Sequence, residues 1–172
     1  DGHVKLLDFG IAKLLDDDAA AGATLVTRAA GRVFTPDYAA PEQITQGAVT
    51  TATDVYALGV LLYLLLTGRH PTALPTQTAV DRMRAVIENE PALVSDAAMK
   101  ADDDTVQTRG TTAHNLSRAL RGDLDNIVLK AIELEPERRY ASAGALADDI
   151  ERMLNGRPVA APVKKFVQVL PV

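Results

Sequence analysis

The chain has 172 residues, which is the length of about one domain, and 47% of them are hydrophobic, which is enough for a sizeable core. Its net charge of −5 argues against a nonspecific nucleic-acid-binding protein, because such a protein needs a basic face to displace phosphate counterions. The absence of cysteine excludes disulfide scaffolds, thiol catalysis and Cys-ligated zinc, and it is compatible with an intracellular location.

The first half of the chain is predicted to contain a short strand, a long loop and one long helix. Weak alternation predicts the strand at residues 3–7, and residues 14–40 show no sustained hydrophobic period. Residues 51–67 are strongly apolar, and Gly68 and Pro71 are typical of a helix end. The longest apolar run has twelve residues, whereas a membrane-spanning helix needs about 20, so we expect this helix to be buried in a protein core.

The second half is predicted to contain three amphipathic helices, at residues 78–89, 124–135 and 143–154. Residues 95–118 are interpreted as an irregular insert, and residues 158–172 as a linker-like tail. The residues expected to cap these helices or to face inward are Val80, Met83, Val86, Ile87, Asp123, Leu124, Ile127, Val128, Ala131, Ile132, Ser142, Leu146, Ile150, Met153 and Leu154. The three histidines lack metal-ligand spacing and are expected at the surface: His3, His70 and His114.

Two tripeptides are candidates for chemistry. Asp8-Phe9-Gly10 follows the predicted strand, where a carboxylate can hold a hard cation against phosphate oxygens and a glycine lets the backbone bend. Ala40-Pro41-Glu42 ends the long loop. In isolation, each has a simpler interpretation: the first as a strand-to-turn Asp-x-Gly, and the second as a helix start with Pro in its first turn and a favourably placed Glu.

Taken together, an Asp-Phe-Gly turn, a threonine-bearing loop and Ala-Pro-Glu match the second half of the protein-kinase signature set in its order. Residues 5–12 look like the strand leading into the metal-binding turn, and residues 35–43 look like the substrate-facing loop. Residues 54–60 look like the central buried helix, and residues 136–140 look like the turn before the last helix. With four motifs in order, the chain resembles the bacterial family of eukaryotic-like serine/threonine protein kinases.

The resemblance implies a mainly α fold, namely the truncated C-terminal lobe of an α+β kinase domain, with at most a short strand pair near the N-terminus. Residues 1–157 would form a partial kinase domain, and residues 158–172 a linker or tail. Within the partial domain, the resemblance implies an activation segment at residues 8–42 and a helical lobe at residues 43–157.

The resemblance also implies roles in binding and catalysis. Asp8 would ligate the magnesium ion that bridges the phosphates of ATP, Phe9 would pack beneath the site, and Gly10 would complete the cofactor-binding turn. Thr35 matches the threonine that helps to position the substrate hydroxyl near the catalytic base. The implied cofactors of the parent domain are therefore Mg²⁺ and ATP.

Three further residues receive structural roles from the resemblance. Glu42 would form a buried, bidentate pair with Arg139 that ties the activation segment to the helical lobe. The pattern alone does not decide whether Arg138 or Arg139 turns inward, and the resemblance selects Arg139. Asp54 matches a buried aspartate that braces the catalytic loop; Thr51-x-x-Asp54 is also a capping-box pattern, and both roles can hold.

Phosphoryl transfer in this family also needs a Gly-rich loop, a strand lysine paired with a helix glutamate, and a His-Arg-Asp catalytic loop. The sequence contains none of these, and all of them precede the Asp-Phe-Gly turn in the family order. We therefore expect the later part of an active kinase that phosphorylates protein Ser and Thr hydroxyls, inactive when isolated. The alternative is a non-catalytic, pseudokinase-like interaction module, whereas a helical domain unrelated to kinases would have to acquire four motifs by accident.

Regulation is predicted to act through the loop at residues 11–39. Thr24 and Thr27 are the expected phosphorylation sites, with Arg28 and Arg32 as nearby phosphate partners; the alternative is that both threonines are ordinary solvated loop residues. The expected partners are protein substrates of the parent kinase and no nucleic acid. The expected location is the cytoplasm, either free or on the cytoplasmic side of a membrane-anchored parent.

Overall fold

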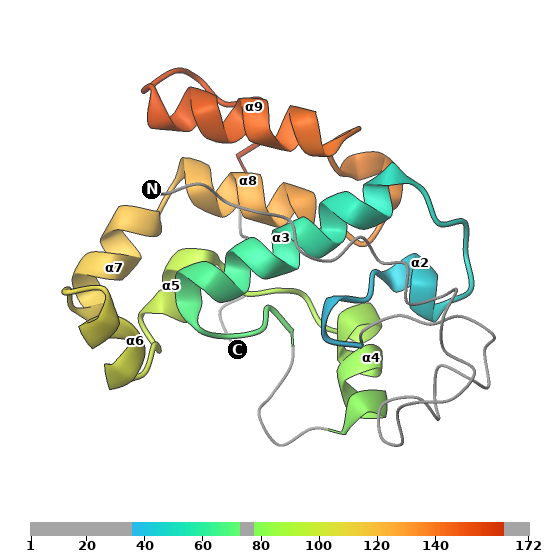
Figure 1. The fold of residues 1–172 in the computed structure, drawn as a ribbon, viewed down its shortest axis with the longest axis horizontal. Helices are drawn as coiled ribbons and strands as arrows, with labels where there is room; N and C mark the ends of the chain where they lie inside the picture. Colours follow the sequence, from blue (N-terminus) through green and yellow to red (C-terminus); the bar gives the residue numbers. More distant parts are fainter. Residues whose placement is uncertain (1–35, 73–77, 164–172) are drawn as a thin grey trace, which may run out of the picture. The chain divides into compact units, whose positions relative to one another are not determined.

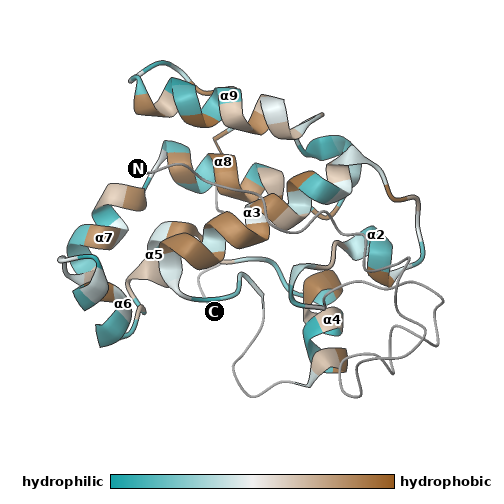
Figure 2. Cartoon of the chain, in the orientation of Figure 1, coloured by the Kyte–Doolittle hydropathy of each residue, from teal (hydrophilic) through white to brown (hydrophobic). Residues whose placement is uncertain are grey.

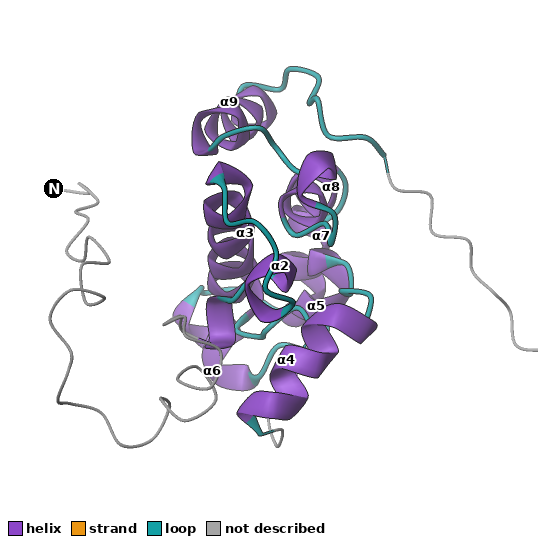
Figure 3. Ribbon diagram, turned by 90° about the vertical axis from the view of Figure 1, so that its right-hand side faces the viewer, coloured by secondary structure: helices purple, strands orange, loops and turns teal. Residues whose placement is uncertain are grey.

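The structure, a computed structural model, describes residues 36–72 and 78–163, and these residues form helices and loops without a strand (Figure 3). The predicted mainly α fold is confirmed for the described residues, and the strand predicted at residues 3–7 lies outside them. The elements in chain order are η2 (Pro36–Tyr38), α2 (Pro41–Ile44), α3 (Thr51–Thr67), α4 (Ala79–Glu88), α5 (Val94–Ala98), α6 (Asp103–Thr108), α7 (Ala113–Leu120), α8 (Asp123–Ala131), η3 (Pro136–Arg138) and α9 (Ala143–Leu154).

Helix α3 is the central element, and it has the predicted bounds. It begins after Thr50, whose hydroxyl accepts a hydrogen bond from the Ala52 N–H at 3.3 Å, and it ends at Gly68, a left-handed residue with φ of 71°. It packs against η2, α5, α8 and α9, and Figure 1 shows it running beside α8. Gly59 permits the close approach to α8, because a Cβ atom at this position would lie only 2.6 Å from Cγ2 of Ile132.

The apolar core consists of two clusters, both of which include residues of α3 and α8. Figure 2 shows hydrophobic residues along most of α3 and hydrophilic residues on α6. The buried members of the larger cluster are Ala40, Tyr56, Val60, Tyr63, Val86, Val94, Ala97, Ala98, Leu116, Leu120, Val128, Leu129 and Ile132. The buried members of the smaller cluster are Val55, Ile127, Ala131, Tyr140, Leu146 and Ala161.

The irregular insert predicted at residues 95–118 is wrong, because this stretch belongs to the three short helices α5, α6 and α7. They have 5, 6 and 8 residues, which is too short for a hydrophobic period to stand out. Helix α5 is stabilised by packing on α7 and α3, with Val94 and Ala98 completely buried. Helices α6 and α7 instead begin at capping side chains, those of Asp102 and Thr112.

The predicted helices on either side of this region are present with small differences. Helix α4 is capped by Thr78 and helix α9 by Ser142, the latter as predicted. Three of the residues expected to face inward are exposed: Val80 at 49%, Ile87 at 40% and Leu154 at 73%. The inward faces of these two helices are therefore narrower than the sequence pattern predicts.

Helix α8 differs from the prediction at both ends. It ends at Ala131 instead of residue 135, and its N-cap is Gly122, with φ of 105°, instead of Asp123. The buried Asp125 carboxylate organises this start, since it accepts hydrogen bonds from the N–H groups of Gly122 at 3.2 Å and Ser95 at 2.8 Å. The helix start is thus fixed by a contact with α5, 30 residues earlier, that local capping rules do not predict.

One face of α3 carries exposed leucines. Leu58, Leu61 and Leu65 are 41%, 40% and 63% exposed, and their spacing places them on one stripe of the helix. Within the described ranges, none of the helices combines the length and the apolar character that crossing a membrane requires.

Candidate functional site

The structure places three of the predicted site residues and brings two of them together. Asp54 is separate, whereas Glu42 and Arg139 meet in a buried ion pair. Over residues 36–72 and 78–163, no group of three His, Asp or Glu residues is arranged to hold a metal ion. The other predicted site residues lie outside the described residues: Asp8, Phe9, Gly10, Thr24, Thr27 and Thr35.

The short helix α2 holds Glu42 in position. Pro41 occupies its first turn, where the fixed φ of proline suits a helix start. The Ala40 N–H donates a hydrogen bond to Oε1 of Gln43 at 2.9 Å, and the Thr45 hydroxyl donates to the Pro41 carbonyl at 3.0 Å. Because both ends of this single turn are bonded, Glu42 is presented from a fixed backbone and is only 7% exposed.

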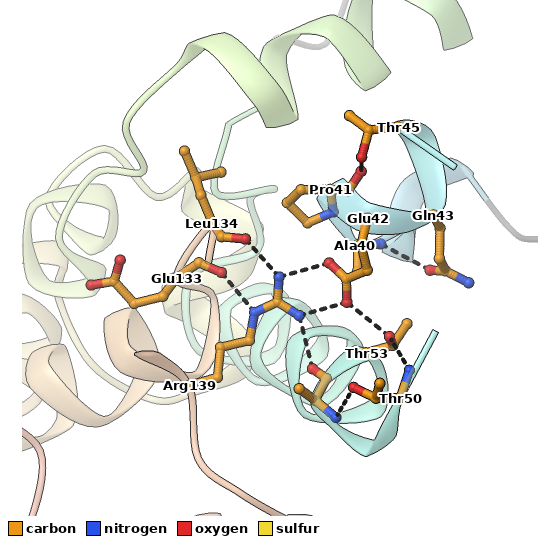
Figure 4. Close-up of polar contacts among 11 residues, drawn as sticks. Ala40, Pro41, Glu42, Gln43, Thr45, Thr50, Thr53, Glu133, Leu134 and Arg139 are labelled. Carbon is orange, nitrogen blue, oxygen red and sulfur yellow. Dashed lines mark hydrogen bonds and ion pairs between the residues drawn. The ribbon is translucent and has the colours of Figure 1, made fainter. Parts of the chain in front are cut away.

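Glu42 and Arg139 form two parallel hydrogen bonds, which confirms the predicted buried, bidentate pair (Figure 4). Arg139 Nη1 donates to Glu42 Oε1 at 2.8 Å, and Nη2 donates to Oε2 at 2.8 Å. The Thr53 hydroxyl, from the first turn of α3, donates a third hydrogen bond to Oε1 at 2.8 Å. The carboxylate thereby joins residues that are 97 positions apart in the chain.

Arg139 has an acceptor for every N–H of its guanidinium group. Besides the two bonds to Glu42, Nη1 donates to the Ala52 carbonyl at 2.9 Å, Nη2 donates to the Leu134 carbonyl at 2.9 Å, and Nε donates to the Glu133 carbonyl at 2.7 Å. The guanidinium group carries five N–H donors in a fixed fork, and all five are used. This saturation allows the cation to be buried, because no donor is left without a partner.

The electrostatics of the junction favour a charged pair. Burial by itself raises the pKa of Glu42, but hydrogen bonds from Arg139 and Thr53, together with the charge of Arg139, outweigh burial and hold the pKa below its ordinary value of 4.5. The Arg139 guanidinium also lies over the ring of Tyr56, at 4.9 Å from the ring centroid. Burial raises the pKa of Tyr56 to about 12, so its hydroxyl stays neutral beside the pair.

The neighbouring arginine behaves differently, which resolves the choice between the two. The Arg138 side chain is 70% exposed and lies 3.9 Å from Glu135, whereas the Arg139 side chain is completely buried. Arg139 follows η3, whose tight turn separates the directions of these consecutive side chains. The contacts made by Arg139 thereby fasten α2, the start of α3 and the turn before α9 to one another.

Asp54 is exposed at the start of α3 in the described residues, which do not test the burial expected beneath a catalytic loop. The capping prediction for this residue is wrong. The N-cap is Thr50, and its partner three residues later is Thr53, whose hydroxyl accepts a hydrogen bond from the Thr50 N–H at 3.2 Å. The predicted role of Asp54 as a brace for a catalytic loop stays a prediction.

A further buried carboxylate, that of Asp149 on α9, was not predicted. It is 1% exposed and accepts hydrogen bonds from the Tyr140 hydroxyl at 2.8 Å, the Ala160 N–H at 2.6 Å and the Ala161 N–H at 2.9 Å. These bonds fold the residues after α9 back onto the helix, and Val159 packs on the smaller core cluster. The first residues of the predicted tail are thus held in place, and residues 164–172 lie outside the described ranges.

Sequence reasoning missed Asp149 for a physical reason. Two of its donors are backbone N–H groups, which leave no mark in the sequence, and its position on α9 is compatible with an ordinary exposed acidic residue. Thr53 and Tyr56 were also missed as members of the junction at Glu42. The available signal was their place on the first turns of α3, the first long helix after the Ala-Pro-Glu tripeptide.

The protein kinase domain family matches residues 1–150 of the chain. The chain belongs to this family. The order of motifs, the helical fold of the described residues and the Glu42–Arg139 pair at the end of the Ala-Pro-Glu segment all agree with that membership.

The chain is similar to bacterial proteins named as serine/threonine kinases. It is 32% identical to serine/threonine-protein kinase PknB of Mycobacterium leprae over 92% of this chain and 21% of that protein. It is 34% identical to the probable serine/threonine-protein kinase SCO3848 of Streptomyces coelicolor, over 93% of this chain and 20% of that protein. It is 33% identical to the probable serine/threonine-protein kinase PknB of Bifidobacterium longum, over the same shares. The chain therefore spans about a fifth of the length of these curated relatives.

Proposed function

We propose that this chain provides the activation segment and the helical lobe of a serine/threonine protein kinase that transfers the γ-phosphate of ATP to Ser and Thr hydroxyls of proteins. The observation that supports this proposal best is the saturated Glu42–Arg139 pair. In this proposal the pair fastens the Ala40-Pro41-Glu42 end of the activation segment to the helical lobe. A segment fastened at this end can present the residues just before it, Thr35 among them, in a reproducible position.

Each predicted site residue has a defined task in this proposal. Asp8 would hold Mg²⁺, since a carboxylate oxygen suits a hard cation, and the bound ion neutralises charge on the phosphates of ATP. Thr35 would orient the hydroxyl that receives the phosphate, and Phe9 would pack beneath the nucleotide site. Glu42 and Arg139 would fix the end of the activation segment on the helical lobe and would not contact the substrate.

The direct test uses the whole protein that contains this chain and measures ³²P transfer from ATP to a Ser/Thr peptide. Asp8→Asn should abolish transfer, because a neutral amide is a poor ligand for Mg²⁺. Asp103→Asn, an exposed acidic residue on α6, is the matched control and should keep the activity of the parent. Full activity of the Asp8→Asn protein would refute the assignment.

A non-catalytic interaction module is the second candidate. The observation that favours it is that the sequence contains no His-Arg-Asp triplet. In both cases the isolated 172-residue chain should neither turn over nor bind ATP, and saturable binding in a titration calorimeter would contradict this expectation. The whole protein decides between the two, because only the kinase phosphorylates the peptide in a manner that depends on Asp8.

We also propose that phosphorylation at Thr24 or Thr27 activates the parent kinase. A phosphate adds about −1.5 to −2 charges and can order a loop by recruiting arginine, for which Arg28 and Arg32 are nearby candidates in sequence. Mass spectrometry of the autophosphorylated protein should find phosphate within residues 11–39. Unchanged activity when both Thr24 and Thr27 are replaced by Ala would exclude this switch.

A further inference from the structure

Asp37 in η2 is held at two of its groups by two different elements. Its carboxylate accepts an ion pair from Arg82 of α4, with 2.9 Å between Nε and Oδ1. Its backbone carbonyl lies 2.9 Å from Nε2 of His70, which belongs to the turn after α3. Asp37 is the second residue after Thr35, so both contacts act on the described part of the predicted substrate-facing loop, residues 36–43.

The contacts of His70 define which ring nitrogen carries the proton. A carbonyl oxygen accepts only from an N–H group, so Nε2 is protonated. Nδ1 accepts a hydrogen bond from the Thr72 N–H at 3.3 Å, which requires an unprotonated nitrogen. The two contacts together fit only the neutral imidazole with its proton on Nε2.

The turn that carries His70 is itself fixed. The buried Thr67 hydroxyl bonds the Tyr63 carbonyl at 2.8 Å and the Arg69 N–H at 3.1 Å, and Gly68 ends α3 in the left-handed conformation. Arg109, which follows α6, donates hydrogen bonds to the carbonyls of Leu65 and Leu66 in the last turn of α3. The imidazole is therefore presented from a rigid support, and the prediction that His70 is an ordinary surface residue is wrong, since it is half-buried and bonded on both nitrogens.

Burial of the ring opposes protonation. It lowers the pKa of His70 below its ordinary value of 6.5, although the carbonyl and carboxylate of Asp37 raise the pKa, and the Arg82 cation lowers it further. A second proton, on Nδ1, would end the contact with the Thr72 N–H, whereas Nε2 would still donate to the Asp37 carbonyl. The hold on Asp37 therefore depends on the Nε2–H donor and not on the state of Nδ1.

We propose that His70 is a positioning residue for the substrate-facing loop, which it holds at the Asp37 carbonyl while Arg82 holds the Asp37 carboxylate. The inference rests on the proposed kinase function for its effect on substrate, but these two contacts, which we call the lock, are a property of the described residues. The lock acts on recognition of the protein substrate through a residue that touches neither ATP nor metal.

The lock is tested on the 172-residue chain by NMR and amide hydrogen exchange. At neutral pH the ring should show a protonated Nε2 and an unprotonated Nδ1, and the Asp37–Ala40 amides should be protected from exchange. In His70→Leu, which removes the Nε2–H donor, protection of these amides should fall about threefold to tenfold. In His70→Gln, which keeps a side-chain N–H, protection should stay within about twofold of the wild type. The opposite tautomer, or equal protection in the wild type and His70→Leu, would overturn the lock.

The consequence for substrate is tested in the whole protein. His70→Leu should raise KM for the peptide about threefold to tenfold and leave KM for ATP unchanged, as expected for losing one hydrogen bond that positions the peptide site. His70→Gln should restore KM for the peptide to within about twofold of the wild-type value. His114→Gln, at an exposed position on α7, is the matched control.

The proposed kinase function and the lock at Asp37 can be refuted independently. If the whole protein transfers no phosphate while the tautomer and exchange results hold, the proposed kinase function fails and the lock stands. If the protein is active and His70→Leu changes KM for ATP as much as KM for the peptide, or changes neither, His70 does not position the substrate-facing loop.

Discussion

Glu42 and Asp149 are both buried carboxylates, 7% and 1% exposed, but they are held by different kinds of partner. Glu42 faces a cation, and its bidentate pair with Arg139 spans 97 residues. Asp149 is held mainly by neutral donors, namely one hydroxyl and two backbone N–H groups that lie 9 to 12 residues away. The half-exposed Arg152 adds only a long ion pair, with 3.8 Å between Nη1 and Oδ1. The first contact therefore joins distant parts of the lobe, and the second fastens a local segment.

The two sites share one feature, which is a cation placed over an aromatic ring. Arg139 lies over Tyr56 at 4.9 Å from the centroid, and Lys130 lies over Tyr140 at 4.2 Å. At the first site the same cation also pairs with the carboxylate. At the second site the Tyr140 hydroxyl donates a hydrogen bond to the carboxylate, and the Lys130 cation lies over the Tyr140 ring. The difference teaches that a buried carboxylate can be stabilised by charge or by hydrogen bonds, and the two solutions should respond differently to mutation and acid.

The largest effect is expected when the cation at the first site is removed. Arg139→Ala leaves the Glu42 charge buried without its partner and three carbonyls without donors, at a cost of about 3–5 kcal/mol in the free energy of unfolding. Arg138→Ala, which removes an exposed guanidinium, should cost less than about 0.5 kcal/mol. Urea unfolding midpoints at constant slope measure both. Similar losses for the two variants would mean that the Glu42–Arg139 pair contributes no more to the free energy of unfolding than an exposed arginine does.

Removing the second carboxylate should have a smaller and more local effect. Asp149→Ala leaves two N–H groups and the Tyr140 hydroxyl without an acceptor, at a cost of about 2 kcal/mol. Because those N–H groups belong to a segment at the end of the described residues, amide exchange at Ala160 and Ala161 should rise more than exchange within α3. The exposed neighbour Asp148 provides the control variant Asp148→Ala. Uniform loss of protection across α3 and the tail would show that the hydrogen bonds of Asp149 do not act locally.

These two sites also separate what the sequence could predict from what it could not. The bounds of α3 followed from an apolar run and from Gly68, both of which are local signals. The Glu42–Arg139 pair has no local signal, and it was predicted only through the resemblance to a known family. The hydrogen bonds of Asp149 and the short helix α5 depend on backbone donors and tertiary packing, which no residue pattern at those positions encodes.

Acid should weaken both sites in the same direction. Hydrogen bonds and charge hold the pKa of Glu42 below 4.5 against the effect of burial, and hydrogen bonds from Ala160 and Tyr140 hold the pKa of Asp149 below 3.8. In each case the unfolded chain binds the proton more readily, so the stabilisation is complete above the ordinary pKa and is lost as the pH falls through the lower folded value. Urea midpoints measured from about pH 6 down to about pH 3 should fall in the wild type and fall less in Asp149→Asn. A fall as steep in Asp149→Asn would show that this carboxylate does not contribute.

The smallest effect is expected when the Lys130 cation over the Tyr140 ring is removed. Lys130→Met keeps most of the apolar stem and removes the charge over Tyr140, at an expected cost of about 0.5 kcal/mol. Because the Lys130 charge also helps to lower the pKa of Asp149, the variant should raise that pKa and shift the acid loss of stability toward higher pH. The exposed Lys100 gives the control Lys100→Met, which should change neither quantity. If Lys130→Met leaves the acid profile unchanged, the charge of Lys130 does not help to hold Asp149, and the contrast with the cation-held Glu42 becomes sharper.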